Sequence, residues 1–351
     1  MRNEDLPPVP PPTIRLDIDR DALGANWRLL DRLSRPARAG AAVKADCYGL
    51  GIDTCLPVLL EAGARDFFVA HWSEVPGVLR HAEAGQVAVL HGVNTPEEVQ
   101  YARATGVRPV INSLHQARLW NQSGGGECHL MIDTGIHRLG ISPEQARDPA
   151  IAALDVGVLM SHLSSADEDG ETSGDQLAAF HAVKDVVGAR ELSIANSAGV
   201  GLGSQYAFDL TRPGLALYGG VPRPELEGRI RQVAFPRASI IQVHELKAGD
   251  SAGYNREFTA SEPMRVATVS LGYADGFLRC WGARGWLEHD GRKLTLLGKV
   301  SMDMVIVDLR DTPDIGLGDW LDVPYDLPFA SRVSGLSQYE LLTVLGQRMR
   351  S

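Results

Sequence analysis

The unit that decides the fold lies in residues 41–71, which read AAVKADCYGLGIDTCLPVLLEAGARDFFVAH. A short apolar run, Ala41–Lys44, is followed by a polar, glycine-containing turn, an amphipathic segment, Thr54–Ala62, and a second apolar run, Asp66–His71. Short apolar runs on either side of a helical segment are typical of parallel strands that are buried on both faces. The stretch therefore predicts a strand–helix–strand unit.

The same pattern recurs from about residue 20 to residue 220. Further strands are predicted at Val87–His91, Val107–Ile111, Cys128–Asp133, Val156–His162, Glu191–Ala195 and Phe208–Leu210, which makes eight in all. Eight strand–helix units in about 200 residues predict an α/β fold, a closed (β/α)₈ barrel of the TIM type. An open doubly wound sheet is the alternative, but no GxGxxG sequence follows the first strand to favour dinucleotide binding.

Helices are expected between these strands, for example at Pro96–Ala104, Ser113–Asn121 and Gly174–Val187. After about Ile230 the pattern changes to β-rich segments, and Asp290-Gly291 between two of them is a hairpin signal. We therefore expect a barrel over residues 13–230 and a mainly β C-terminal domain over residues 231–351. A strand near residues 13–19 is a candidate member of the β domain, and the proline-rich residues 1–12 are expected to be a disordered tail.

The composition limits the function classes. The 351 residues carry a formal net charge of −10, which argues against binding to nucleic acid or to an anionic membrane. Four widely spaced cysteines without a CxxC pair indicate neither a disulfide framework nor a zinc site, and no metal is expected. Neither a signal peptide nor a long uncharged apolar run is present. We expect a soluble protein of the reducing cytoplasm.

The carboxyl ends of barrel strands are where catalytic groups gather. Lys44 ends the first predicted strand, so its amine should enter the barrel mouth, where a lowered pKa would suit Schiff-base formation. A lysine that extends from a strand end into solvent is the alternative. Arg138 follows the fifth strand and could bind a substrate carboxylate, although an ordinary surface arginine has the same sequence signature.

Polar residues also follow the last three strands. His162 ends the sixth strand, and Ser197 follows the seventh. Ser197 with the backbone N–H groups of Gly214 and Leu215 would form a phosphate site, because such barrels commonly bind phosphate after strands seven and eight. Taken singly, a buried core histidine, a helix N-cap and a turn glycine explain these residues better than a functional role does.

Seven blocks of the sequence resemble, in order, those of the alanine racemase family, pyridoxal-phosphate (PLP) enzymes built from a barrel and a β domain. The resemblance runs from about Arg15 to Arg348. The blocks are VKADCYGLG, DTGIHRLG, ANSAG, RPGLALYG, GYNREFTA, LGYADGF and GKVSMDMVIVDL.

The resemblance implies a two-base reaction that interconverts L- and D-alanine. Lys44 would hold PLP as an internal aldimine and then move a proton at the substrate Cα, while Tyr254 would act on the opposite face. His162 would link by hydrogen bonds to Tyr254 and to Arg212, which would face the pyridine nitrogen of PLP. A guanidinium does not readily give up a proton, so that nitrogen would stay unprotonated.

The remaining site residues also follow from the resemblance. Tyr48, Ser197, Tyr339 and the backbone of Gly214 and Leu215 match phosphate-binding positions.

Arg138 and the backbone of Met302 match the groups that hold the substrate carboxylate, and Tyr273 and Asp303 match positions lining the approach. The family forms head-to-tail homodimers, so Tyr254, Tyr273, Met302 and Asp303 would enter the site from a partner subunit. Supply of D-alanine for peptidoglycan is the implied role, with alanine catabolism equally compatible.

Two departures from the family pattern stand out. Several members have a carboxylated lysine that bridges to the arginine matching Arg138, whereas this chain has Met131, and a thioether cannot form a carbamate. The chain also ends at Ser351, where many relatives continue.

Other functions therefore stay open. One is a racemase of broader specificity or another PLP enzyme on the same fold, such as a decarboxylase or aldolase. The other is a PLP-binding protein without turnover, although such relatives are usually single barrels. The presence of both Lys44 and Tyr254 favours racemisation.

Overall fold

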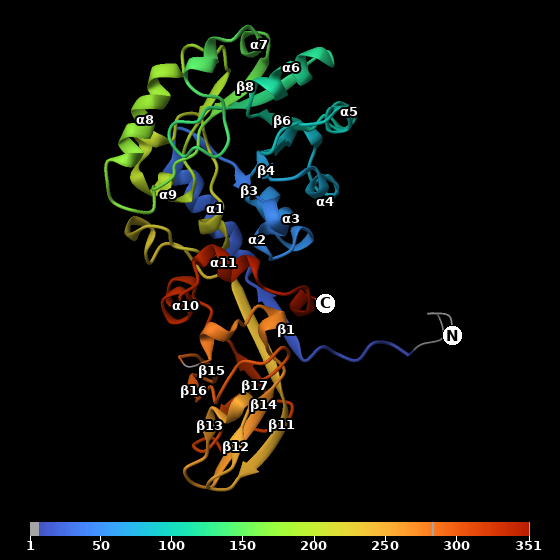
Figure 1. Ribbon diagram of the computed structural model, residues 1–351, viewed down its shortest axis with the longest axis vertical. Coiled ribbons are helices and arrows are strands. Elements are labelled where there is room, and N and C mark those ends of the chain that lie inside the picture. Colours follow the sequence, from blue (N-terminus) through green and yellow to red (C-terminus); the bar gives the residue numbers. More distant parts are fainter. Residues whose placement is uncertain (1–6, 283, 351) are drawn as a thin grey trace. The chain divides into compact units, whose positions relative to one another are not determined.

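The computed structural model describes residues 7–282 and 284–350 and divides into two compact units. One unit is Arg20–Val233, and the other is formed by Ala234 onward together with the N-terminal segment that ends at Asp19 (Figure 1). Residues 7–12 are exposed and have no regular secondary structure. Residues 1–6, the other half of the expected tail, lie outside the described residues.

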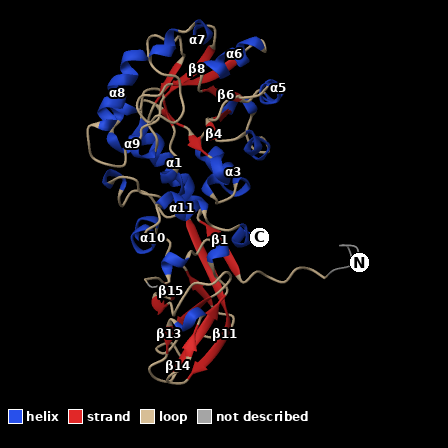
Figure 2. Ribbon diagram, viewed as in Figure 1, coloured by secondary structure: helices blue, strands red, loops and turns tan. Residues whose placement is uncertain are grey.

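The first unit is built on parallel strands, seven of which pair in the order β3 to β9. Each of the eight predicted strands has a counterpart among β3 to β10, and β2 is a ninth strand that was not predicted. Figure 2 draws β4, β6 and β8 in red. The strands are β2 (Arg38–Ala39), β3 (Ala41–Ala42), β4 (Phe67–Val69), β5 (Val87–Val89), β6 (Arg108–Ile111), β7 (Glu127–Met131), β8 (Asp155–Met160), β9 (Glu191–Ser193) and β10 (Leu210–Thr211).

The ring of strands closes between its first and last members. β10 pairs in parallel with β2, with Leu210 opposite Arg38. Just beyond these strands, Ala42 N donates to Pro213 O at 2.8 Å. On the other edge of β10, Arg212 N donates to Ala195 O, also at 2.8 Å. The predicted closed barrel is thereby confirmed, and the open doubly wound sheet is wrong.

Helices connect the strands, and two of the predicted helices begin with a capping side chain. Thr95 Oγ1 accepts the N–H of Glu98 at 3.3 Å, and Ser113 Oγ accepts that of Gln116 at 3.2 Å, which satisfies a donor that each helix start leaves unpaired. The helices of this unit are α1 (Arg20–Ser34), α2 (Lys44–Tyr48), α3 (Ile52–Ala62), α4 (Val75–Val78), α5 (Pro96–Thr105), α6 (Leu114–Gln122), α7 (Pro149–Ala152), α8 (Thr172–Val183) and α9 (Ser197–Leu202).

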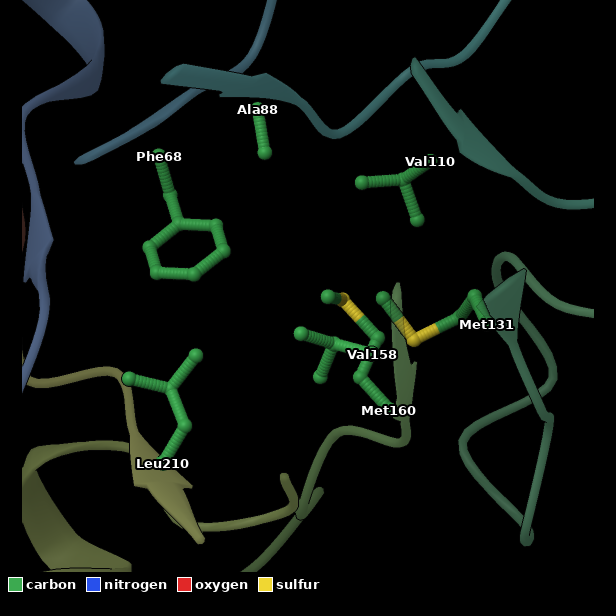
Figure 3. Close-up of a cluster of buried hydrophobic side chains, with 7 residues drawn as sticks. All are labelled: Phe68, Ala88, Val110, Met131, Val158, Met160 and Leu210. Atoms are coloured by element: carbon green, nitrogen blue, oxygen red, sulfur yellow. The ribbon is translucent and has the colours of Figure 1, made fainter. Parts of the chain in front are cut away.

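Apolar side chains from six strands fill the inside of the barrel (Figure 3). Alternate residues of each strand point inward, so the cluster contains one or two members from each. Because the interior is packed, a ligand site of this unit belongs at an end of the barrel. The buried cluster consists of Phe68, Ala88, Val110, Met131, Val158, Met160 and Leu210.

The second unit is mainly β, as predicted. One antiparallel sheet has the order β16-β15-β18-β11-β14-β17, and β1 pairs with β11, with Ile14 opposite Ala238. The Asp290-Gly291 turn joins β15 to β16, and both residues have positive φ, 49° and 76°. Its strands are β1 (Ile14–Ile18), β11 (Ala234–Leu246), β12 (Ser251–Ala252), β13 (Phe258–Thr259), β14 (Met264–Val269), β15 (Trp286–His289), β16 (Arg292–Thr295), β17 (Val305–Asp308) and β18 (Trp320–Asp322), and its helices are α10 (Leu327–Ser334) and α11 (Gln338–Thr343).

Candidate active site

Lys44 lies just beyond β3, at the start of a turn with an uncommon backbone. The sequence predicted strand up to this residue, but β3 ends at Ala42 and residues 45–48 have φ between 53° and 56°, the left-handed region that L-residues rarely adopt. Lys44 is partly buried, and this burial lowers the pKa of its amine. The Arg138 guanidinium lowers that pKa further, whereas the Glu74 carboxylate raises it. The amine is therefore neutral more often than that of a surface lysine.

Hydrogen-bond donors gather where the chain turns after β9 and β10. Ser197 Oγ accepts the N–H groups of Gly214 at 2.9 Å and Ala216 at 3.1 Å, so its own O–H is left as a donor. A Cβ at Gly214 would lie 2.2 Å from Tyr48 Oη, so only glycine lets the tyrosine approach. Leu215 begins a 3₁₀ turn, where an N–H has no partner within the turn. Two hydroxyls and an N–H group form a cradle suited to an anion.

Arg212 and His162 follow β10 and β8 in largely buried surroundings. The guanidinium of Arg212 donates to Ser193 Oγ and to the carbonyl of Ser161. Burial lowers the pKa of Arg212 to about 10, which leaves it charged at neutral pH. Burial, followed by the charge of Arg212, lowers the pKa of His162 to about 3. The imidazole is therefore neutral near pH 7.

Arg138 is presented by a loop that follows β7. Asp133 Oδ1 accepts the N–H groups of Gly135 at 2.9 Å and of Ile136 and His137 at 3.1 Å, which fixes the first half of this loop. The Arg138 side chain is exposed. It makes no ion pair within residues 7–282 and 284–350, so its charge is available to a ligand.

Met131, which stands at the position of the family's carboxylated lysine, is part of the apolar cluster in Figure 3. It is 6% exposed and lies among Val110, Val158 and Met160. On the neighbouring strand end, Asn112 Oδ1 is buried without a hydrogen-bond partner among the described residues. This position therefore carries a thioether, and the neighbouring strand end presents a neutral amide.

The other predicted site residues belong to the second unit. Tyr254 lies in a 3₁₀ turn and is 64% exposed, and Met302 is 53% exposed. Tyr273 N donates to Ser301 O at 3.0 Å, which joins its turn to the loop that carries Met302. Tyr339, on α11, is 44% exposed.

Asp303 forms an ion pair with Arg348 at 2.8 Å, and Arg348 also binds the buried Asp275 at 2.8 Å. Asp275 Oδ2 in turn accepts the N–H of Gly272 at 2.9 Å. Arg348, near the end of the chain, is therefore tied to the turn that carries Tyr273.

Two family models cover nearly the whole chain. The alanine racemase N-terminal domain matches residues 18–222, and the alanine racemase C-terminal domain matches residues 233–351. The chain belongs to the alanine racemase family.

Known alanine racemases are similar to this chain over more than nine tenths of their length. That of Methylobacterium nodulans is 40% identical over 353 residues, which cover 95% of this chain and 94% of the relative. A catabolic alanine racemase of Rhizobium johnstonii is 38% identical, covering 95% and 93%.

Solved alanine racemase structures show the same fold. The Bartonella henselae enzyme, with covalently bound pyridoxal phosphate, superposes with a TM-score of 0.89 at 32% identity, covering 96% of this chain and 98% of that one. The biosynthetic enzyme of Pseudomonas aeruginosa gives 0.87 at 30% identity, with coverage of 96% and 98%. The family, the isomerase class and the PLP dependence predicted from the sequence are confirmed. The roles of single residues stay predictions.

Sequence reasoning missed Glu74. Its carboxylate accepts N–H groups from both the Lys44 turn and the end of β4. Its only sequence signal is a carboxylate shortly after a strand end, which is also typical of an ordinary helix start.

Among residues 7–282 and 284–350, none of the helices has the length and apolar character that a membrane crossing requires.

Proposed function

We propose that this alanine racemase family member interconverts L- and D-alanine by a two-base mechanism, with Lys44 as one base and Tyr254 of the partner subunit as the other. The observation that carries the proposal is the grouping at one end of the barrel. There, the partly buried Lys44 amine and the exposed Arg138 accompany the donor cradle formed by Tyr48, Ser197 and Leu215.

The residues present fit PLP. The cradle, with Gly214 as the residue that admits Tyr48, suits its phosphate, and Tyr339 would add a hydroxyl. Arg212 would face the ring nitrogen, and the Lys44 amine would take the aldehyde carbon. When bound, PLP supplies an electron sink that acidifies the substrate Cα–H bond.

Racemisation needs a proton removed from one face of Cα and another delivered to the opposite face. Lys44 Nζ can do this on its face because its lowered pKa keeps part of the amine neutral. A phenol with a pKa near ~10 is a weak base at neutral pH. We therefore assign to neutral His162 two hydrogen bonds, one to Tyr254 and one to the charged Arg212. Through these bonds the positive charge of the guanidinium would stabilise the phenolate form of Tyr254.

Arg138 would bind the substrate carboxylate as a bidentate pair, with the backbone of Met302 from the partner subunit completing the contact. Tyr273 and Asp303 of the partner subunit would line the approach. Because Met131 brings no negative charge, the full charge of Arg138 is available to the substrate.

A homodimer with shared sites makes a sharp prediction for mixed subunits. Lys44→Ala and Tyr254→Phe proteins should each be nearly inactive. In a heterodimer, one of the two sites has both groups intact, so mixing should restore up to about a quarter of wild-type activity. If both variants are inactive alone and no activity returns after verified subunit exchange, the sharing of sites is wrong.

The reaction is tested by chiral chromatography of PLP-loaded protein incubated separately with L-alanine and D-alanine. Both should converge on a racemic mixture, and Arg138→Ala should approach it much more slowly at low substrate concentration. A panel of larger amino acids distinguishes a broad-specificity racemase. Bound PLP with no change in alanine would favour a decarboxylase or aldolase, or a PLP-binding protein without turnover.

Supply of D-alanine for peptidoglycan in the cytoplasm is the role that we propose. The four cysteines are free, as expected of a reducing compartment. The names of relatives include both a biosynthetic and a catabolic enzyme, so the two roles must be distinguished in the organism that carries the gene. Deletion of the gene should create a D-alanine requirement, whereas a catabolic role predicts a growth defect only on alanine.

A further inference from the structure

The backbone that follows Lys44 requires support from elsewhere in the barrel. Residues 45–48 all have left-handed φ, and none of them is glycine. Side chains of L-residues crowd the following carbonyl in this conformation, so a run of four is stable only where surrounding contacts hold it. Cys47 and Tyr48 are buried, but Ala45 and Asp46 are exposed and contribute little packing. Hydrogen bonds must therefore hold the half of the turn that is next to Lys44.

One carboxylate supplies these bonds. Glu74 Oε1 accepts the N–H of Ala45, the residue directly after Lys44. Glu74 Oε2 accepts the N–H groups of Ala70 at 2.7 Å and His71 at 2.9 Å, where the chain leaves β4. Bonds from N–H groups to a carboxylate are stronger than neutral ones. A single side chain thus ties the Lys44 turn to the end of the neighbouring strand.

We propose that Glu74 is a positioning residue that holds the left-handed turn against β4 and so aims the Lys44 amine into the barrel mouth for attachment to PLP. The proposal rests on the proposed function, since it takes Lys44 as the lysine that binds PLP. Attachment forms one C=N bond between Lys44 Nζ and the aldehyde carbon and releases one water. Glu74 touches neither atom and acts only through the backbone and through its charge.

The other carboxylate of the turn has a different place. Asp46 Oδ1 accepts the N–H of Ile52 at 2.6 Å, which ties the turn to the start of α3 rather than to β4. Asp46→Asn keeps an oxygen acceptor there and removes one charge from the same turn. It is therefore the matched control for Glu74→Gln.

The test measures PLP attachment in the full-length protein, from which PLP has been removed with hydroxylamine and to which it is then added back. Visible absorbance gives the dissociation constant and its pH dependence, and borohydride trapping with peptide mapping identifies the lysine. We expect Glu74→Ala to weaken attachment at least tenfold, with Asp46→Asn within about twofold of wild type. A thermal unfolding scan checks that both variants fold.

Glu74→Gln separates a positioning role from simple structural damage. The charge of Glu74 raises the pKa of Lys44, so its removal lowers that pKa and the pH midpoint of attachment should move to lower pH. Wild-type dissociation constants and pH midpoints in folded Glu74→Ala and Glu74→Gln proteins would overturn the inference. Loss of fold in Glu74→Ala leaves Glu74→Gln to decide. A wild-type adduct on another lysine would overturn the proposed function itself, which keeps the two failures distinct.

Discussion

The two ends of the barrel both contain cationic side chains, but at one end these form ion pairs, whereas at the other three of them form none within the described part of the chain. At the amino end, arginine and carboxylate side chains surround the strand starts, and each arginine there has at least one carboxylate partner. The pairs are Arg38 with Asp66 and Glu191, Arg108 with Glu127, and Arg190 with Glu127 and Asp155.

At the carboxyl end, by contrast, three cations have no carboxylate within ion-pair distance among the described residues. Lys44, Arg138 and Arg212 make no ion pair within the part of the chain that the structure describes. Burial makes this costly for Lys44 and Arg212, whose pKa values are both lowered. The ion pairs at the amino end stabilise the fold. The unpaired cations at the carboxyl end are suited to an anionic ligand, such as a phosphate or a carboxylate.

The largest effect is expected at Lys44. Lys44→Ala should abolish the borohydride-trapped PLP adduct and lower turnover by about 10⁴-fold, because both cofactor attachment and proton transfer are lost. Lys184→Ala is the control, since Lys184 pairs with Asp185 on the outside of the barrel. Chiral chromatography measures turnover, and peptide mapping locates the adduct. An adduct that persists in Lys44→Ala would contradict the assignment.

Arg138→Ala should act mainly on substrate binding. Loss of a bidentate bond to the carboxylate should raise KM by about 10–100-fold. The Arg138 charge also lowers the pKa of Lys44, so its removal raises that pKa. Because the neutral amine is the base, the acidic limb of kcat should move to higher pH.

Arg190→Ala, at the amino end, is the matched control for Arg138→Ala and should change neither KM nor the pH profile. The same unchanged values in Arg138→Ala would show that the cations of the two ends do not differ in function.

Met131→Lys tests whether the apolar cluster tolerates a charged side chain. A lysine there would place its amine among Val110, Val158 and Met160, so unfolding by urea should show a loss of about 2–4 kcal/mol. Met131→Leu conserves volume and polarity and should cost less than about 1.5 kcal/mol. If added bicarbonate restores the stability of Met131→Lys, the lysine is carboxylated. Unchanged stability without bicarbonate would mean that the cluster is more open to water than the burial of its residues indicates.

The sequence predicts the barrel well because its strands are buried on both faces and therefore appear as apolar runs. The site residues at strand ends follow from that pattern, since a polar residue directly after such a run lies at the barrel mouth. The prediction fails at Lys44 itself, which was placed at the end of a strand but begins a left-handed turn. Among residues 45–48 only Asp46 is of a type that favours positive φ, so the local signal for four such residues in a row is weak.

Glu74 illustrates the other limit. Its partners are backbone N–H groups at Ala45, Ala70 and His71. Because every residue except proline has a backbone N–H, the residue types at these positions do not reveal the contact. Only the parallel pairing of β3 with β4 brings the end of β4 beside the Lys44 turn. Contacts of this kind depend on tertiary structure and cannot be derived from composition or periodicity.

The smallest effect is expected at the amino end, where Glu127 binds both Arg108 and Arg190 at 2.9 Å. Glu127→Gln keeps the shape and removes the charge. Because these pairs are partly exposed, the free energy of unfolding should fall by less than about 1 kcal/mol. The loss should be smaller still at high salt, which screens the ion pairs. Turnover should stay within about twofold of wild type, since the packed cluster of Figure 3 separates this end from Lys44. Urea unfolding and chiral chromatography on the same preparation measure both quantities. A large loss of turnover at unchanged stability would mean that the paired end takes part in catalysis, and the contrast between the two ends would fail.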